Sequence, residues 1–209
     1  MTWTSGVGRA CGVLLDAIVR LLALSRINPN ALTVMGLLVN TYAAVLFGYA
    51  NVDNQRRMFF YAGLVIIGSG FFDLVDGRVA RASNKVTRFG GFFDSIVDRY
   101  SDASLFLGLV VFYGRGNRFF YVVLAAVAMI SAIMVSYARA RAESLIGTCR
   151  VGFMERPERL VLLIIGALFN VMAPVLWVIA ALSTITVVHR IIYTWQRTRE
   201  MDSLAGRAA

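Results

Sequence analysis

Charged side chains are scarce in this sequence. Asp, Glu, Lys and Arg make up 16% of its 209 residues, against roughly 25% in an average soluble protein. Hydrophobic residues make up 58%, and so few charges cannot cover that much apolar surface in water. The two cysteines, the three prolines and the absence of a glycine period also exclude a disulfide scaffold, a disordered chain and collagen. The composition therefore predicts an integral membrane protein.

Long apolar segments recur along the chain, and a helix needs roughly 20 such residues to cross a bilayer. At that length, 209 residues hold one membrane domain of about six spans. The predicted fold class is therefore all-α, with six transmembrane helices. The predicted spans are 31–50, 58–80, 89–113, 119–138, 160–169 (extended backwards through Glu158) and 171–193.

The N-terminal segment 7–24 is apolar but carries Arg9, Asp16 and Arg20, which share one face of a helix. This pattern is typical of an amphipathic helix that lies in the membrane interface. We therefore predict three parts of the chain: a juxtamembrane amphipathic helix in 1–27, a six-helix transmembrane domain in 28–195 and a cytoplasmic tail in 196–209.

The basic residues predict the orientation. Sixteen of the 21 Lys and Arg residues lie in or beside the N-terminal segment, the loop after the second span, the connector after the fourth span and the C-terminal tail. By the positive-inside rule these segments and both termini are cytoplasmic. We expect a multi-pass protein of the cytoplasmic membrane. The net charge of +9 is typical of contact with anionic lipid or a phosphorylated substrate, whereas arginines scattered among apolar spans argue against nucleic acid.

Aspartates interrupt the second and third spans, although each costs roughly 2.5–3.5 kcal/mol at a span centre. Asp73 and Asp76 are separated by three residues, and Asp94, Asp98 and Asp102 by four, so each set lies on one helix face. A short loop joins these antiparallel spans and places the two faces opposite each other on the cytoplasmic side. Salt bridges to nearby arginines are the competing interpretation of these aspartates.

Converging carboxylates are the oxygen ligands that hard divalent cations such as Mg²⁺ require. Two ions would neutralise four carboxylates and leave room for a diphosphate, as in two-metal displacement at phosphorus. Gly77 and Gly90 lie one turn from aspartates and would let a ligand approach the backbone closely. Helix packing is the alternative explanation for each glycine. Arg81 lies one turn beyond Gly77, where its guanidinium could hold a phosphate.

The segment 73–98 matches the pattern D-x-x-D-G-x-x-A-R-x8-G-x3-D-x3-D at all eight fixed positions. In this it resembles the CDP-alcohol phosphotransferase (CDP-alcohol phosphatidyltransferase) family, and the six-span plan extends the resemblance to the whole chain. The resemblance implies transfer of the phosphatidyl group of a CDP-linked lipid, CDP-diacylglycerol, to the hydroxyl of a polar alcohol, with release of CMP.

The resemblance also implies roles for individual residues. Asp73, Asp76, Asp94 and Asp98 would hold two divalent ions, Mg²⁺ with Mn²⁺ as the alternative, and Asp98 would be the general base. The implied nucleotide and CDP-lipid contacts are Asn30, Ala31, Leu32, Thr33, Gly77, Arg81, Thr87 and Gly90. Homodimers are common in the family, so the resemblance also implies a homodimer.

The arginines after the fourth span predict the acceptor. Arg190 interrupts an apolar span, where a buried arginine is costly, and several arginines beside a metal site suggest a second phosphate. Segments 136–143 and 152–159 resemble those of phosphatidylinositol-phosphate synthases and their archaeal relatives, although lysine is commoner at the position of Arg139. This finer resemblance implies inositol 1-phosphate as the acceptor, with glycerol 3-phosphate as the alternative. The implied acceptor-phosphate ligands are Ser136, Arg139, Arg141, Arg159 and Arg190.

Two other classes of protein could also place acidic residues in apolar spans. An intramembrane prenyltransferase also binds a diphosphate through aspartate-held Mg²⁺, but the spacing of Gly77, Arg81 and Gly90 does not favour it. An ion-coupled transporter would carry its charges near the bilayer midplane and would have related halves, whereas these acids cluster at one side. Asp102 lies outside the motif, and extension of the acceptor site and pairing with an arginine both stay open for it. The sequence assigns no role to His189.

Overall fold

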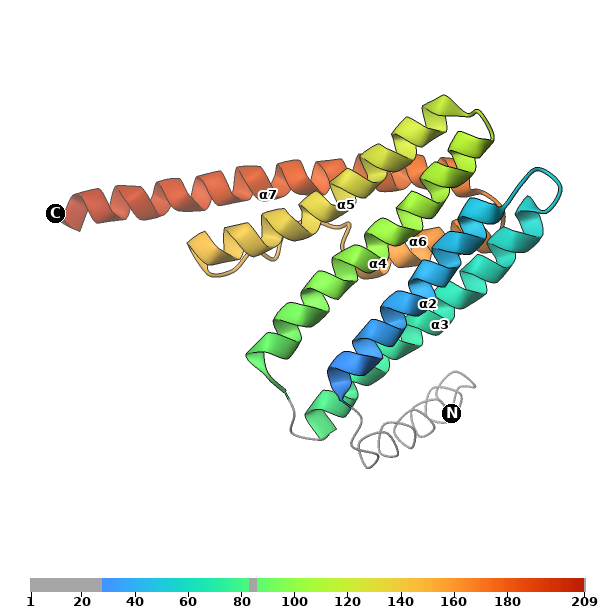
Figure 1. The fold of residues 1–209 in the computed structure, drawn as a ribbon. Helices are drawn as coiled ribbons and strands as arrows, with labels where there is room; N and C mark the ends of the chain where they lie inside the picture. Colours follow the sequence, from blue (N-terminus) through green and yellow to red (C-terminus); the bar gives the residue numbers. More distant parts are fainter. Residues whose placement is uncertain (1–27, 83–85, 209) are drawn as a thin grey trace, which may run out of the picture.

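The computed structural model describes residues 28–82 and 86–208, which form six helices and no strand. Asp76 and Gly77 are placed in the third helix by their backbone alone. The prediction of an all-α chain is confirmed for this part, and the predicted amphipathic helix in 1–27 lies outside it. The helices, shown in Figure 1, are α2 (Pro29–Tyr49), α3 (Gln55–Ala82), α4 (Arg88–Arg115), α5 (Phe119–Ile146), α6 (Arg156–Leu168) and α7 (Met172–Ala208).

Three of these helices, α2, α5 and α7, are long and apolar enough to cross a membrane. α3 and α4 are long enough, but their aspartates and arginines make them less apolar. α6 has only 13 residues, which at 1.5 Å per residue give about 20 Å, less than the roughly 30 Å of a bilayer core. The remaining three spans and the orientation of the termini stay predictions.

Two helices extend further than the sequence predicts. α5 continues to Ile146 and ends at Gly147, whose φ of 79° suits glycine. Arg139 and Arg141 therefore belong to a helix and not to a loop. α7 runs without interruption from Met172 to Ala208, because no proline breaks the basic segment after the last apolar residues.

One end of the bundle is closed by apolar packing and short links. The links α2–α3, α4–α5 and α6–α7 lie together there, whereas the opposite helix ends spread apart (Figure 1). The Gln55 side-chain amide donates to Asn170 Oδ1 at 2.9 Å, and so joins two of the links. The ring of Phe59 packs edge-on against those of Phe47 and Phe112, each with centroids 4.9 Å away. We call this the apolar end.

Glycine allows close packing of α2 against α4. A Cβ at Gly108 would lie 2.3 Å from the carbonyl oxygen of Ala44, so the two backbones are almost in contact. This approach fixes α4 relative to α2, and it positions the aspartates of α4, which lie toward the other end.

Candidate active site

Carboxylates from α3 and α4 meet around one arginine at the end of the bundle away from the apolar end. Arg156, the first residue of α6, places its Nη1 2.8 Å from Asp73 Oδ2 and 2.9 Å from Asp98 Oδ1. Its Nε lies 3.4 Å from Asp102 Oδ1. Asp94 lies close enough to Asp73 and Arg156 to interact with both electrostatically. The predicted convergence of the two aspartate-bearing helix faces is therefore present for the residues whose side chains are described.

These carboxylates suit a cation. In the part of the chain that the structure describes, no three acidic, histidine or cysteine side chains are close enough to hold a metal ion together. Asp73 and Asp98 nevertheless come from facing helices and share one positive group, the Arg156 guanidinium, between them. Carboxylate oxygens that already surround a positive group are also the ligands that a hard divalent ion requires. Asp73 and Asp98 therefore have the oxygen donors that the predicted metal site requires, and that site stays a prediction.

Asp102 and Arg159 form a buried ion pair behind this cluster. Arg159 Nη2 lies 2.5 Å from Asp102 Oδ2, and Arg159 Nη1 donates to the carbonyl oxygen of Met154 at 3.3 Å. The exposed fractions of Asp102 and Arg159 are 5% and 1%. Arg159, which the family resemblance assigns to the acceptor phosphate, is thus enclosed by protein, and Asp102 is its partner.

A cavity of about 380 Å³ opens beside Asp98. Ser136 and Arg139 of α5 and Arg190 of α7 line it, as the predicted phosphate site requires. Arg141 does not; it is exposed, and its Nη1 donates to Ser144 Oγ at 3.3 Å. The other charged side chains that line the cavity are Arg99, Asp102, Glu143, Glu155 and Arg156.

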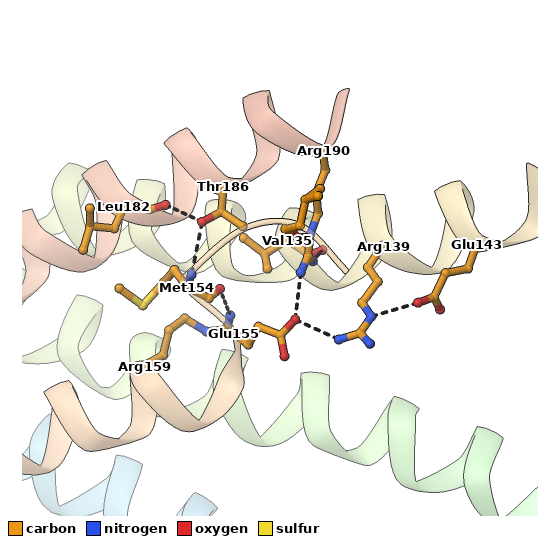
Figure 2. A network of polar contacts seen from close by, with 10 residues as sticks. Val135, Arg139, Glu143, Met154, Glu155, Arg159, Leu182, Thr186 and Arg190 are labelled. Atoms are coloured by element: carbon orange, nitrogen blue, oxygen red, sulfur yellow. Dashed lines mark hydrogen bonds and ion pairs between the residues drawn. The ribbon is translucent and has the colours of Figure 1, made fainter. Parts of the chain in front are cut away.

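Glu155 connects two arginines of this cavity, as Figure 2 shows. Its Oε1 accepts from Arg139 Nη1 at 2.8 Å and from Arg190 Nη2 at 3.0 Å. Arg139 Nε also donates to Glu143 Oε1 at 3.0 Å. Arg190 Nη1 donates to the carbonyl oxygen of Val135 at 2.6 Å. The two guanidinium groups are thus held at fixed positions on α5 and α7.

The connector between α5 and α6 is attached to α7. The Met154 N–H donates to Thr186 Oγ1 at 3.1 Å (Figure 2). Arg190 Nε donates to the carbonyl oxygen of Val151 at 2.8 Å. Gly152 lies between them with a φ of 101°, and a Cβ there would lie 2.4 Å from Thr186 Cγ2. Only glycine fits this position. These contacts fix the backbone from which Glu155 and Arg156 extend.

Three of the predicted nucleotide contacts lie together where α2 and α4 begin. The Thr87 hydroxyl caps α4 by accepting from the Gly90 N–H at 2.9 Å. A Cβ at Gly90 would lie 3.0 Å from Thr87 Oγ1 and 3.5 Å from Asn30 Oδ1. The absence of a side chain at Gly90 therefore leaves space between two polar groups. Asn28 caps α2, and its Oδ1 accepts from the Asn30 N–H at 3.1 Å.

The other predicted nucleotide contacts differ in exposure. Leu32 is buried against Val75 and Val79 and so supports the helix pair from inside. Thr33 is also buried, and its hydroxyl donates to the carbonyl oxygen of Pro29 at 3.2 Å. Ala31 and Arg81 are exposed and accessible to a ligand.

Three residues of the site had no role in the sequence-based prediction. Arg156 was only one of several arginines in a basic connector, and Glu155 only its acidic neighbour. Gly36 of α2 has no motif, but a Cβ there would lie 3.3 Å from Asp73 Oδ1. Gly36 carries no local signal, and the resemblance of segment 152–159 assigned no role to Glu155 or Arg156, because the partners of all three residues lie on other helices.

The fold and the motif define a membrane-associated enzyme, and the chain belongs to the CDP-alcohol phosphatidyltransferase family, whose model matches residues 26–195. It is therefore a transferase of phospholipid synthesis. It is 38% identical over 188 residues to an archaetidylinositol phosphate synthase of Pyrococcus horikoshii, which covers 90% of this chain and 93% of the relative. It is 34% identical to a phosphatidylinositol phosphate synthase of Mycobacteroides abscessus over 78% of this chain and 75% of the relative.

Solved structures of one relative have the same fold. The phosphatidylinositol phosphate synthase of Mycobacterium tuberculosis with CDP-DAG bound matches with a TM-score of 0.77 at 28% identity, over 87% of this chain and 93% of that chain. The same synthase in complex with manganese and citrate matches with a TM-score of 0.75, over 87% of this chain and 88% of that chain.

Proposed function

We propose that this enzyme transfers the phosphatidyl group of CDP-diacylglycerol to a hydroxyl of inositol 1-phosphate, giving phosphatidylinositol phosphate and CMP. One observation carries the proposal. A cavity of about 380 Å³ is lined by the motif carboxylate Asp98 of α4 and by Arg139 of α5 and Arg190 of α7, whose guanidinium groups both contact Glu155. This arrangement suits an acceptor with a reacting hydroxyl at one end and a phosphate at the other.

Asp73, Asp76, Asp94 and Asp98 would hold the metal ions. Two Mg²⁺ ions, or Mn²⁺, bound there would neutralise the donor diphosphate and the departing CMP. The residues Asn30, Thr87 and Gly90 would contact the nucleotide, since they surround a space at the starts of α2 and α4. The structures of the Mycobacterium tuberculosis synthase with CDP-DAG bound and with manganese and citrate support this donor and this class of metal.

Asp98 would be the general base, because it is the motif carboxylate that lines the cavity. The acceptor oxygen forms a bond to the lipid-bearing phosphorus, and the bond from that phosphorus to the bridging oxygen breaks. CMP leaves with the bonding electrons, and the hydroxyl proton passes to the Asp98 carboxylate. Positioning the hydroxyl beside both this carboxylate and the donor contributes the entropic part of the rate enhancement.

Arg139 and Arg190 would bind the acceptor phosphate. Their planar guanidinium groups match phosphate oxygens, and both already hold the Glu155 carboxylate. Glycerol 3-phosphate carries the same phosphate and is the second candidate acceptor. The names of the relatives from Pyrococcus and Mycobacteroides favour inositol phosphate.

We place the enzyme in the cytoplasmic membrane with both termini and the active site on the cytoplasmic side. The basic connector and the basic end of α7 support this orientation. A homodimer is also proposed, because α2 and α4 present apolar side chains such as Leu38, Leu107 and Val111 on their exposed faces.

The test is CMP release by the purified protein in mixed micelles with Mg²⁺ and CDP-diacylglycerol, with one acceptor at a time. We expect release with inositol 1-phosphate and none with free inositol or serine. Release with glycerol 3-phosphate alone would replace the acceptor and keep the reaction. No release with any acceptor, from either a diacyl or an ether-linked donor, would overturn the proposed function.

A further inference from the structure

We propose that Arg156 is a displaceable counter-ion, which holds the motif carboxylates of α3 and α4 together until a divalent metal ion takes its place. The inference rests on the proposed metal site. It assigns to Arg156 a role distinct from that of Arg139 and Arg190, because Arg156 contacts the metal-binding motif itself.

The first support is the position of the guanidinium. Its Nη1 bridges Asp73 on α3 and Asp98 on α4 at 2.8 and 2.9 Å. A divalent ion bound between the same two carboxylates would sit roughly 2.0–2.1 Å from their oxygens. The ion and the guanidinium therefore cannot occupy this place together, and their like charges also repel each other. Metal binding must move the Arg156 side chain.

The second support is that Arg156 is incompletely bonded where it lies. Its Nη2 is buried and has no hydrogen-bond partner among the residues that the structure describes. Arg190 provides the contrast, since its Nε, Nη1 and Nη2 all donate to named acceptors. A buried donor without a partner is costly, so Arg156 loses less than Arg190 would by leaving its place.

The third support is that only the side chain has to move. The backbone at Arg156 is fixed on one side by the connector, through Met154 and Thr186. On the other side it is fixed by the buried pair of Arg159 with Asp102. A change of rotamer can carry the guanidinium from the carboxylates into the cavity, which Arg156 already lines.

The charges of the cavity give this movement a consequence. Its lining has no net formal charge, because four arginines face four carboxylates. The arginines are Arg99, Arg139, Arg156 and Arg190, and the carboxylates are Asp98, Asp102, Glu143 and Glu155. A balanced site attracts a phosphate dianion weakly. When metal neutralises Asp98 and frees Arg156, the cavity becomes positive. Metal and acceptor phosphate should therefore bind cooperatively, and the coupling must be reciprocal.

The test measures Mn²⁺ binding to the purified full-length protein without substrate. Electron paramagnetic resonance of the free ion reports how much Mn²⁺ is bound. Arg156→Gln should bind Mn²⁺ roughly tenfold more tightly than the wild type, within the range of about 5- to 150-fold that is typical of coupled sites. Arg156→Lys keeps the positive charge but loses the planar guanidinium group. Its affinity for Mn²⁺ should therefore lie between those of the wild type and Arg156→Gln. The matched control is Arg197→Gln, which removes an exposed positive charge on α7 that pairs with Glu200. It should leave the affinity unchanged.

Thermal unfolding gives a second readout that does not depend on turnover. In EDTA, Arg156→Gln should unfold at a lower temperature than the wild type, because the carboxylates then repel one another without a counter-ion. Saturating Mn²⁺ should raise its midpoint by more than it raises that of the wild type. If Arg156→Gln does not fold in EDTA, the same comparison is made with Arg156→Lys.

The outcomes separate the two proposals. Unchanged or weaker Mn²⁺ binding by Arg156→Gln, in a preparation whose wild type releases CMP, would overturn the counter-ion role and leave the reaction standing. Absence of Mn²⁺ binding in every variant would overturn the metal site and the counter-ion role together. In the wild type, we also expect Mn²⁺ to increase the affinity for inositol 1-phosphate, and equal affinity with and without Mn²⁺ would overturn the coupling.

Discussion

The two ends of the helical bundle are built from opposite kinds of side chain. At the apolar end, Phe47, Phe59 and Phe112 stack edge-on and the links between helices are short. At the other end, which we call the charged end, Arg156 and Arg159 pair with aspartates of two helices. Packing at the apolar end holds the helices in register, whereas the charged end contains the buried and half-buried charges to which we assign binding and reaction. Substitutions at the two ends should therefore separate stability from activity.

The largest difference between the effects on activity and on stability is expected for a substitution at Asp98. Asp98→Asn keeps the shape of the side chain but removes the carboxylate that we propose as a metal ligand and as the general base. We expect CMP release to fall by about 10³-fold or more, whereas the unfolding midpoint stays near that of the wild type. Turnover is measured in micelles at saturating acceptor, and folding by thermal unfolding. Turnover within tenfold of the wild type would exclude Asp98 as the base.

The buried pair of Asp102 with Arg159 should behave differently from its exposed neighbours, because it lies at the charged end but is enclosed by protein. Arg159→Gln leaves Asp102 without its nearest cation, and removal of one partner of a buried pair costs about 3–5 kcal/mol. We expect a marked fall in the unfolding midpoint and a parallel loss of active protein. Arg159→Lys is the control that keeps the charge. If Arg159→Gln weakens only acceptor binding, with no change in the midpoint, Arg159 is a phosphate ligand and not a structural cation.

The apolar end should show the reverse pattern. Gly108→Ala places a Cβ against the carbonyl oxygen of Ala44, at 2.3 Å before any relaxation. Such overpacking costs about 1–3 kcal/mol. The unfolding midpoint should fall, and the turnover of the protein that remains folded should stay at the wild-type level. Gly68→Ala is a matched control on α3, since a Cβ there meets no atom within 4 Å. Equal effects of the two substitutions would show that α2 and α4 do not require this close approach.

The charged end also shows what a sequence can predict. The spacing of Asp73, Asp94 and Asp98 predicted both the helix pair and the meeting of its acidic faces, because a helix period relates residues three and four apart. Helix ends were less predictable: α5 was expected to end before Arg139, yet nothing before Gly147 stops it. The pairing of Arg156 across three helices could not be predicted, because no local pattern records which distant side chains meet.

The smallest effect on turnover is expected at Arg139, which we propose as a ligand of the acceptor phosphate. The Arg139 guanidinium donates to Glu143 and Glu155. Arg139→Lys keeps the positive charge but loses the planar fork, so phosphate attraction remains while its geometry changes. We expect KM for inositol 1-phosphate to change about twofold to tenfold, which corresponds to the roughly 0.5–1.5 kcal/mol of a typical hydrogen bond, with kcat nearly constant. Arg139→Gln, which removes the charge as well, should raise KM further. If kcat falls and KM stays constant in both variants, Arg139 acts on the reacting end of the acceptor, and the phosphate lies elsewhere in the cavity.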